Sequence, residues 1–297
     1  MKALLNRFVE EKGNSKYNLE VLRKSEKDTI YRLDMTDETF IYRVHTIKSA
    51  KAVNEILALR FLEREFPSEE FYPKIICSNN TEIITKYLAG NQSFPFELNI
   101  TQIKNLGRVF NTLVKKTPSS YYTIDRLDIM QRGSAYNISS DMITGYAIPK
   151  FNLLAIRRPS FSRMIRKNIE KILCDNQKVL QDCRKFNFFH YDLVDNIVVD
   201  GGQPKLIDWE KSGFGDPAYN LAVMVIIGKF SSLQENKLQE EFKGFKDDTF
   251  SMRYKFYKTL GLVINFLWLY NKKEIEKIYP ESIWELNELE SKMMEVF

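Results

Sequence analysis

The sequence is poor in the residues that build zinc sites and disulfide frameworks. It has three cysteines, widely separated and never in a Cys-x-x-Cys pair, and only two histidines among 297 residues. A structural zinc site needs four Cys or His ligands close together, so we do not expect one. An odd number of scattered thiols is typical of proteins in a reducing compartment, and we expect a cytoplasmic protein with free cysteines.

Long apolar runs are also missing. No stretch approaches the ~20 consecutive apolar residues that a membrane-spanning helix needs. The longest candidate, Gly261 to Tyr270, predicts a buried helical segment instead. The N-terminal residues MKALLNRFVEEKGNSK carry charges within their apolar run and lack a cleavage-site pattern, so they do not predict a signal peptide. We therefore expect no membrane partner.

The chain lacks a block of charge of one sign. Its formal net charge is +5, but Lys and Arg are interspersed with Asp and Glu over most of its length. Nucleic-acid-binding proteins usually concentrate positive charge on one surface, so we expect no nucleic-acid partner. The modest positive charge is compatible with an anionic substrate or cofactor. A nucleic-acid-binding protein remains an alternative that a binding assay at ordinary salt would test.

The order of predicted elements changes along the chain. The first ninety residues predict a strand-rich region with one helix, and the remainder is mostly helical. The predicted strands are 18–24, 29–35, 40–45, 74–78 and 82–87, and the predicted helix is 49–66. We expect a first domain over 1–88 and a second over 89–297, with one isolated hairpin inside the second.

That hairpin lies in the stretch FFHYDLVDNIVVDGGQPKLIDWEKSGFGDP, from Phe188 to Pro217, which is unusually rich in acids. Two short β-prone runs flank a turn at Gly201 and Gly202, residues that tolerate positive φ. This turn places Asp208 opposite Asp195 and diagonal to Asn196. Carboxylate and amide oxygens suit Mg²⁺, which prefers oxygen ligands and keeps several waters. The pattern predicts a magnesium site at the open end of the hairpin.

The same stretch resembles the catalytic core of the aminoglycoside phosphotransferase and choline kinase group. The resemblance rests on His190-Tyr191-Asp192, on Asn196, on Ile207-Asp208-Trp209-Glu210 and on Gly215-Asp216-Pro217. It implies an α+β, protein-kinase-like bilobal fold. The N-terminal lobe would be a small antiparallel sheet with one main helix that binds nucleotide. The larger C-terminal lobe would be mostly helical and would carry the catalytic loop and the acceptor pocket.

The resemblance also implies roles for individual residues. Asp192 would be the catalytic base that orients the substrate hydroxyl, and Asn196 and Asp208 would hold Mg²⁺ at the phosphates of ATP. Arg43, on a predicted strand, would bind the phosphates as the lysine or arginine of the group does. Glu55 lies on the apolar stripe of the following helix and needs a partner there, because an unpaired buried charge is costly. We expect Arg43 to be that partner.

Further residues match the group with less specificity. Lys86, Tyr87 and Leu88 stand where its members form a hinge whose backbone pairs with adenine. Ser25 begins the turn that would cover the phosphates, although the turn Ser25 to Asp28 contains no glycine. His190 is expected to support the catalytic loop through hydrogen bonds.

Two more acids complete the predicted set. Asp216 is expected to cap the helix that Pro217 begins. The loop from Asp192 to Asn196 is one residue shorter than is usual in the group. Either this loop is tighter or Asp195 contributes to the coordination of the metal.

The sequence therefore predicts an ATP- and Mg²⁺-dependent kinase that phosphorylates a hydroxyl of a small molecule. Choline or another amino alcohol, an aminoglycoside and a sugar-like acceptor all remain open. An aromatic cage for choline could draw on Trp209, Trp268 or Trp284. The alternative is a catalytically inactive pseudokinase that binds nucleotide or a protein partner, since both the glycine-poor turn and the short catalytic loop depart from the group's pattern.

Overall fold

The computed structural model describes residues 3–13, 16–26, 28–45, 50–115, 148–183, 187–242, 247–275, 277 and 286–297. These residues form two compact units. Among the described residues, unit 1 contains those up to 94 and those from 190 to 213, and unit 2 contains those from 95 to 189 and from 214 to 297. Unit 1 is therefore assembled from two stretches that lie far apart in the sequence.

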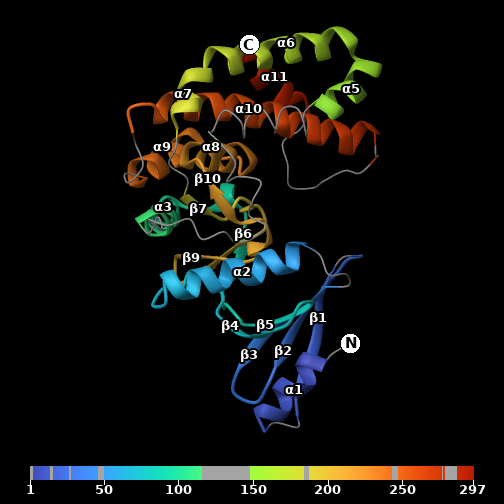
Figure 1. Ribbon diagram of the computed structural model, residues 1–297, viewed down its shortest axis with the longest axis vertical. Helices are drawn as coiled ribbons and strands as arrows, with labels where there is room; N and C mark the ends of the chain where they lie inside the picture. The colour runs from blue at the N-terminus through green and yellow to red at the C-terminus, as the bar shows by residue number, and fades with distance from the viewer. Residues whose placement is uncertain are drawn as a thin grey trace. The chain divides into compact units, whose positions relative to one another are not determined.

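Unit 1 is built on a five-stranded antiparallel sheet with the strand order β1-β2-β3-β5-β4 (Figure 1). Two helices and a small second sheet accompany it. The elements of unit 1 are α1 (Ala3–Glu11), β1 (Asn18–Lys24), β2 (Asp28–Asp34), β3 (Thr39–His45), α2 (Ala50–Glu65), β4 (Ile75–Ser78), β5 (Glu82–Lys86), β6 (Asn91–Ser93), β8 (Ile197–Asp200), β9 (Gln203–Leu206) and the 3₁₀ turn η4 (Trp209–Lys211).

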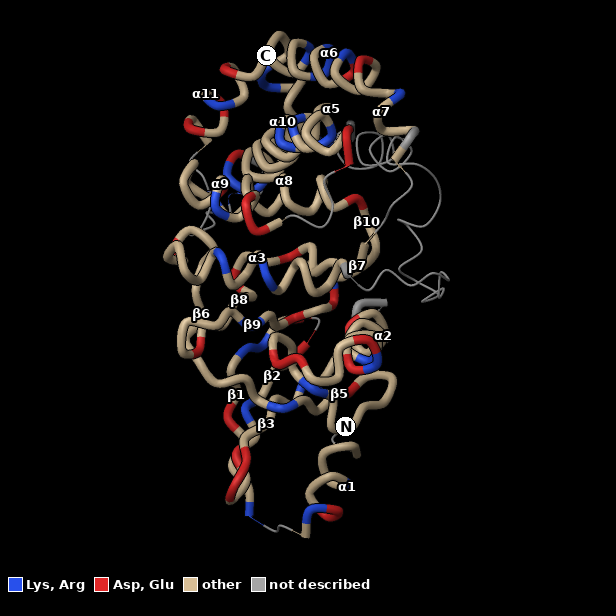
Figure 2. Tube along the Cα trace, turned by 90° about the vertical axis from the view of Figure 1, so that its left-hand side faces the viewer, with Lys and Arg blue, Asp and Glu red and all other residues tan. Residues whose placement is uncertain are grey.

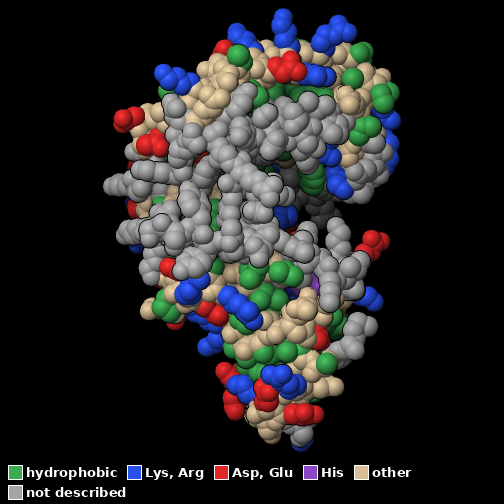
Figure 3. All heavy atoms as spheres, in the orientation of Figure 1, with side chains coloured by type: hydrophobic (Ala, Val, Ile, Leu, Met, Phe, Trp, Pro, Cys, Tyr) green, Lys and Arg blue, Asp and Glu red, His purple; other side chains and the backbone are tan. Residues whose placement is uncertain are grey.

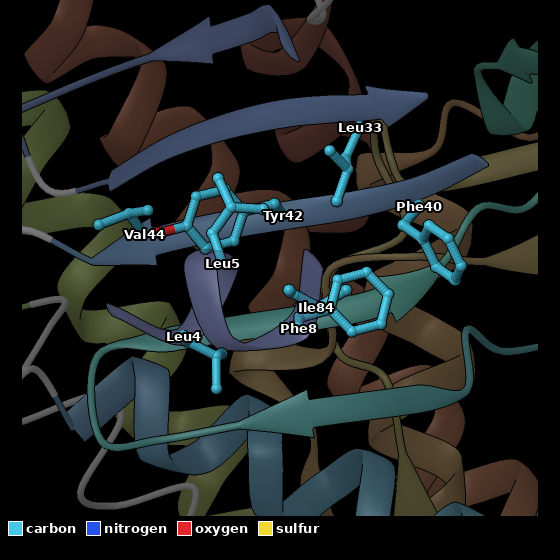
Figure 4. Close-up of a cluster of buried hydrophobic side chains, with 8 residues drawn as sticks. All are labelled: Leu4, Leu5, Phe8, Leu33, Phe40, Tyr42, Val44 and Ile84. Atoms are coloured by element: carbon cyan, nitrogen blue, oxygen red, sulfur yellow. The ribbon is translucent and has the colours of Figure 1, made fainter. Parts of the chain in front are cut away.

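The two faces of the five-stranded sheet differ because side chains alternate along a strand. Phe40, Tyr42 and Val44 of β3 join a buried apolar cluster that also contains Leu5 and Phe8 of α1 (Figure 4). The rings of Phe8 and Phe40 meet edge to face at 5.1 Å. Residues of β3 between these positions belong to the opposite face. The burial of α1 thus fixes which face of β3 remains for Arg43.

Helix α1 was not predicted, and the expectation of a single helix in the first ninety residues was wrong. Its apolar face is short: Leu4, Leu5 and Phe8 are its buried residues within nine. Glu82 of β5 accepts a hydrogen bond from the backbone N–H of Leu4 at 3.4 Å. Contacts with the sheet, rather than a long periodic pattern, therefore define this helix.

The acid-rich hairpin has the predicted register, with Ile197 opposite Leu206 and Asp200 opposite Gln203. It is not isolated, which corrects the sequence prediction. Strand β6 pairs antiparallel with β8 and makes a three-stranded sheet. Gly90, which precedes β6, has φ +135°, and a Cβ there would lie 2.5 Å from the carbonyl oxygen of Val199. Only glycine fits this close approach of the two backbones.

Unit 2 is mostly helical. Strand β10 (Gly213–Gly215) begins at the last residue of unit 1 and pairs with β7 (Asn187–Phe189) in a two-stranded sheet. The other described elements of unit 2 are η1 (Pro95–Glu97), α3 (Ile100–Lys115), α5 (Ile148–Arg157), α6 (Pro159–Asp175), α7 (Gln177–Asp182), α8 (Pro217–Ile227), α9 (Ser232–Glu241), α10 (Phe250–Tyr270), the π-helical turn η5 (Asn271–Ile275) and α11 (Leu286–Val296).

The core of unit 2 lies around α10, whose segment from Gly261 to Tyr270 is buried at most positions, as predicted. The segment Pro159–Asp182 forms two helices, α6 and α7, which are separated at Asn176. The side-chain nitrogen of Asn176 donates to the carbonyl oxygen of Ile172 at 2.9 Å, which satisfies a terminal acceptor of α6 and ends that helix.

The architecture confirms the predicted fold class, with a small antiparallel sheet in one unit and a mainly helical second unit. Most of the segment from Pro118 to Pro149 lies outside the described residues. None of the helices described is both long and apolar enough to cross a membrane. Basic and acidic residues are interspersed along the trace of each unit (Figure 2), and both kinds are scattered over the face of unit 1 seen in Figure 3.

Candidate active site

Arg43 is the centre of a buried ion cluster in unit 1. Its Nη1 donates to Oε2 of Glu55 at 2.6 Å and to Oδ1 of Asp208 at 3.0 Å. The arginine is 6% exposed and Glu55 is 5% exposed, so both charges are shielded from water. Charge-assisted bonds of this kind are the strong ones, particularly where little water competes. The structure thus joins β3, α2 and the end of the hairpin through one guanidinium, including the pair expected from the sequence.

The two carboxylates of this cluster differ in their acidity. Burial raises the pKa of Glu55 to about 7, although the charge of Arg43 pulls it down. Burial also opposes ionisation of Asp208, but the charge and hydrogen bond of Arg43, with help from Arg23, outweigh it and hold the pKa of Asp208 below its usual value. Asp208 is therefore an anion at neutral pH. The pKa of Glu55 lies near neutrality because burial opposes its ionisation.

The open end of the hairpin brings Asn196 next to the residues around Asp208. The backbone N–H of Ile207 donates to the carbonyl oxygen of Asn196 at 3.0 Å, so the pairing continues one step beyond the strands. Asp208 then leaves the extended conformation with φ +61°. The side-chain nitrogen of Asn196 donates to the carbonyl oxygen of Asp192 at 2.9 Å, which leaves its side-chain oxygen as the atom suited to a cation.

His190 anchors the loop before the hairpin. Its ring is fully buried, and Nε2 lies 2.7 Å from the carbonyl oxygen of Ile207. The backbone N–H of Asp192 donates to its Nδ1 at 3.3 Å. Burial lowers the pKa of His190, so the neutral ring prevails at pH 7. Its ring meets that of Trp209 edge to face at 4.6 Å, and these contacts are those of a supporting residue.

Asp192 carries an ion pair that was not predicted. Its Oδ2 lies 2.6 Å from Nζ of Lys211, in the 3₁₀ turn after Asp208, and both side chains are partly exposed. Lys211 follows the Ile-Asp-Trp-Glu motif directly, which is the only signal that the sequence offers for it. Asp192 therefore keeps an accessible carboxylate whose position is set by a neighbouring cation.

The loop from Asp192 to Asn196 closes as a tight turn. The N–H of Asn196 donates to the carbonyl oxygen of Leu193 at 3.3 Å, and Asp195 takes φ +63°. Tyr191 stands at φ +62°. A left-handed conformation at such residues costs on the order of 1 kcal/mol each. Partial burial and the nearby charge of Asp192 raise the pKa of Asp195.

A cavity of about 540 Å³ lies within unit 1 and is walled by the ion cluster on one side. It brings together most of the predicted cofactor-binding and metal-binding residues. Its walls include Arg43, Glu55, Lys86, Tyr87, Leu88, Asp195, Asn196 and Asp208, with apolar side chains such as Leu22, Ile30, Ile41, Ile83, Val198 and Ile207. Neither Ser25 nor Asp192 lines it. Apolar walls with a few convergent polar groups are typical of a small-molecule site.

The donors at this cavity fit Mg²⁺ only in combination with a ligand. No group of three His, Cys, Asp or Glu side chains capable of holding a metal occurs in the described ranges. Asp208 and Asn196 both line this cavity, and their side chains can offer hard oxygen donors. Mg²⁺ commonly takes one or two carboxylates and completes its shell with phosphate oxygens and water.

The turn between β1 and β2 holds Arg23 against the ion cluster. Nη2 of Arg23 donates to Oδ2 of Asp28 at 2.9 Å and lies 3.8 Å from Oδ2 of Asp208. Burial opposes ionisation of Asp28, but its bonds to Ser25 and Arg23 lower its pKa. Arg23 and Asp28 were not among the predicted site residues, because the sequence of the turn gives no signal for the ion pairs that its charged residues form.

Asn54 is a further residue that sequence analysis missed. Its side-chain nitrogen donates to the carbonyl oxygens of Glu210 at 2.7 Å and Ser212 at 3.1 Å. Its neighbour Glu55 reaches Arg43, which in turn reaches Asp208. Two adjacent residues of α2 are therefore bound to the segment that follows the hairpin, one through the backbone and one through the ion cluster.

Asp216 belongs to unit 2 and forms the expected cap. Its Oδ1 accepts a hydrogen bond from the N–H of Ala218 at 2.9 Å, in the first turn of α8. The same carboxylate accepts from Nε of Arg253 at 2.8 Å, and Arg253 also bonds to Asp247. These contacts place Asp216 in the framework of unit 2.

Solved structures that resemble this chain include several small-molecule phosphotransferases. A macrolide 2′-phosphotransferase from Brachybacterium faecium superposes with a TM-score of 0.66 at 15% identity, covering 93% of this chain and 95% of that one. The aminoglycoside phosphotransferase APH(2″)-IIa, in its gentamicin complex, gives 0.64 at 12% identity, with 98% and 95% covered. Choline kinase LicA from Streptococcus pneumoniae gives 0.61 at 15% identity, with 99% and 98% covered.

The chain thus has the fold of the aminoglycoside phosphotransferase and choline kinase group, as its motifs predicted. No protein-family model matches the sequence, and no curated protein matches it significantly. At these identities the likeness establishes the fold, and the function rests on the residues of the site itself.

Proposed function

We propose that the protein is an ATP- and Mg²⁺-dependent kinase that phosphorylates a hydroxyl of a small molecule. The observation that carries this proposal is the joining of Glu55, Arg43 and Asp208 at the wall of a cavity that Asn196 also lines. Phosphoryl transfer needs positioning and neutralisation of charge more than covalent chemistry, and this arrangement offers both. Solved structures of the same fold hold ATP with streptomycin, and ADP with hygromycin B.

In this proposal, different residues bind the adenine, the metal and the phosphates. The hinge residues Lys86, Tyr87 and Leu88 contact adenine through their backbone, and the apolar walls enclose the base. Asn196 and Asp208 hold Mg²⁺, which would offset the negative charge of the phosphates. Arg43, kept in place by Glu55, binds phosphate oxygens. The nucleotide-binding lobe over 1–88 and the helical lobe over 89–297 with the acceptor pocket remain part of this proposal.

Asp192 acts as the general base. As the acceptor oxygen attacks the γ-phosphorus, a new O–P bond forms and the bond to the β–γ bridging oxygen breaks, which releases ADP. The proton of the acceptor hydroxyl passes to the Asp192 carboxylate. Lys211, 2.6 Å from that carboxylate, keeps it in position. His190 and the tight turn at Asp195 support the loop.

The acceptor is a hydroxyl-bearing small molecule of the kinds that the fold is known to serve. The choice among amino alcohols, aminoglycosides and sugar-like compounds calls for a screen. Trp209 is fully buried, and its Nε1 donates to the carbonyl oxygen of Leu206, so it serves the core and is not free to form a cage for choline. Trp284 lies outside the described residues.

The proposal is tested by ADP release with ATP, Mg²⁺ and a panel of amino alcohols, sugars, nucleosides and aminoglycosides. We expect at least one acceptor to be turned over. With that acceptor, Asp192→Asn should lower kcat by roughly 10²–10⁴-fold while ATP affinity stays nearly intact, because a positioned base contributes about that much. Asp200→Asn is the matched control, since Asp200 lies on the same hairpin, half exposed and paired with Lys205.

Normal turnover by Asp192→Asn would disprove the assignment of the base. Binding of ATP without turnover of any acceptor would favour the inactive pseudokinase. Omission of Mg²⁺ should abolish turnover, and Asp208→Asn should remove the response to added Mg²⁺.

A further inference from the structure

The turn that would cover the phosphates uses its own hydrogen-bonding groups internally. The N–H of Ser25 donates to the carbonyl oxygen of Asp28 at 2.8 Å, and the N–H of Asp28 donates to Oγ of Ser25 at 3.1 Å. The hydroxyl of Ser25 donates to Oδ1 of Asp28 at 2.6 Å. A phosphate-binding loop normally offers backbone N–H groups to its ligand. In this turn the N–H groups of Ser25 and Asp28 are bonded within the turn and are not offered to a ligand.

A bulge in β1 supplies a side chain in their place. Val21 lies opposite Tyr31 and Arg23 lies opposite Ile30, so the register shifts at Leu22. Successive residues of a regular strand point to opposite faces, whereas a bulge redirects them. Leu22 and Arg23 consequently both line the cavity that holds the ion cluster.

The carboxylates around this cavity would repel a phosphate chain, so a further cation would favour its binding. Glu55, Asp195 and Asp208 contribute carboxylates to its walls. Arg43 is buried, and its Nη1 is engaged by two of these carboxylates. The side chain of Arg23, by contrast, is 52% exposed and lies at the same wall. Its guanidinium has donors beyond the one bonded to Asp28, and its planar fork suits phosphate oxygens.

We propose that Arg23 binds the phosphates of the nucleotide and replaces the glycine-rich backbone cradle that this turn lacks. Asp28 positions the guanidinium through the bond from Nη2, 2.9 Å long. The distance of 3.8 Å from Nη2 to Oδ2 of Asp208 places the guanidinium beside a predicted ligand of the metal, where the phosphates of a magnesium-bound nucleotide belong. This inference rests on the proposed function, since it concerns the nucleotide of that same site.

Isothermal titration calorimetry on the full-length protein compares its affinity for MgATP with its affinity for adenosine. Arg23→Gln should weaken MgATP binding about 10- to 100-fold, which is the usual loss for a charge-assisted hydrogen bond. Adenosine affinity should stay within about twofold, because adenosine has no phosphate. Arg23→Lys should recover part of the loss, since it restores the charge without the fork.

Lys24→Gln is the matched control. It removes the same charge from the adjacent residue, which is exposed and does not line the cavity. We expect its MgATP affinity to remain within about twofold of the unmodified protein.

The outcomes separate this inference from the proposed function. Unchanged MgATP binding by Arg23→Gln, or equal losses for MgATP and adenosine, would overturn the role of Arg23 and leave the kinase proposal standing. A loss in Lys24→Gln as large as in Arg23→Gln would reduce the effect to general electrostatics and also overturn it. If the unmodified protein binds no MgATP, both the proposed function and this inference fail.

Discussion

Each of the two units contains a buried arginine bound to carboxylates, and the two clusters are built differently. In unit 2, Arg253 is 1% exposed and bonds to Asp216 through Nε and Nη2 and to Asp247 through Nη1 and Nη2. Asp216 in turn caps α8. In unit 1, Arg43 bonds to Glu55 and Asp208 through the same nitrogen, at the wall of a cavity.

The difference shows that clusters of arginine and carboxylates can serve either the framework of a unit or a site at a cavity. The unit 2 cluster is closed: its donors and acceptors satisfy one another and join α8 to the start of α10. The unit 1 cluster combines an acid that titrates near neutrality, an aspartate at φ +61° and a neighbouring arginine that is half exposed. Perturbed acidity and backbone strain at a cavity are features that active sites concentrate.

The largest expected effect contrasts the two arginines. Arg253→Met should lower the free energy of unfolding by about 3–5 kcal/mol, because it leaves the buried carboxylate of Asp216 without its partner. Arg43→Met should cost less, about 1–3 kcal/mol, because Glu55 can take up a proton near pH 7 and Asp208 borders a cavity. Urea unfolding of both variants at pH 7 measures this. Equal losses would contradict the view that only one cluster is mainly structural.

The next effect is on pH dependence. Glu55 has a folded-state pKa of about 7, above its ordinary value of 4.5. Between these values the folded protein binds the extra proton, so this residue's contribution to stability is complete below about pH 4.5 and is lost as the pH rises through about 7. The difference in unfolding free energy between the protein and Glu55→Gln should change by about 1–3 kcal/mol from pH 5 to 8 in metal-free buffer.

In the unit 2 cluster, the pKa of Asp247 is shifted in the opposite direction to that of Glu55. The pKa of Asp247 is lowered, because its bonds to Arg253 and Thr249 outweigh the effect of burial. Its contribution is therefore present above its ordinary pKa and is lost only in acid, outside the window from pH 5 to 8. His45 and His190, whose pKa values are lowered by burial, act in the opposite direction to Glu55 and cancel in the difference. A flat difference curve would contradict the titration of Glu55.

The smallest effect separates two buried amides that make the same kind of contact. Asn54 donates to the carbonyl oxygens of Glu210 and Ser212, and Gln234 of unit 2 donates to those of Phe96 and Leu98. Asn54→Leu and Gln234→Leu should each cost about 1–2 kcal/mol of stability, because carbonyl groups lose their donor.

Only the first of these variants should alter catalysis. Asn54→Leu loosens the hold of α2 on the segment after Asp208, and we expect roughly a tenfold loss in kcat with the acceptor found by the screen. Gln234→Leu should leave kcat within about twofold. A similar loss of kcat in both variants would mean that the effect is one of general stability.

The parts of the site that were predictable are those set by short-range rules. The Gly201-Gly202 turn fixes the hairpin register, so the nearness of Asn196 and the end of β9 follows from counting residues. Strand alternation and helical spacing put Arg43 and Glu55 on facing surfaces. These rules need no knowledge of the rest of the chain.

The residues that were missed depend on irregular backbone or on distant partners. Arg23 reaches the cavity because of a bulge, and Lys211 reaches Asp192 through a 3₁₀ turn. Strand β6 and helix α1 exist because of pairing and packing with segments far along the chain. Periodicity carries no signal for such contacts, since tertiary structure creates them.

The composition of unit 1 from two separate stretches has a consequence for synthesis of the protein. When residues up to 94 have left the ribosome, Arg43 and Glu55 are present, but β6 lacks β8 and Asp208 has not been made. About a hundred further residues must be translated before the first unit can close, which at ordinary elongation rates takes roughly 5–20 seconds. During that interval the nascent chain exposes the edge of β6 and an incomplete charge cluster. The buried ion cluster at the cavity is therefore the product of late, long-range assembly.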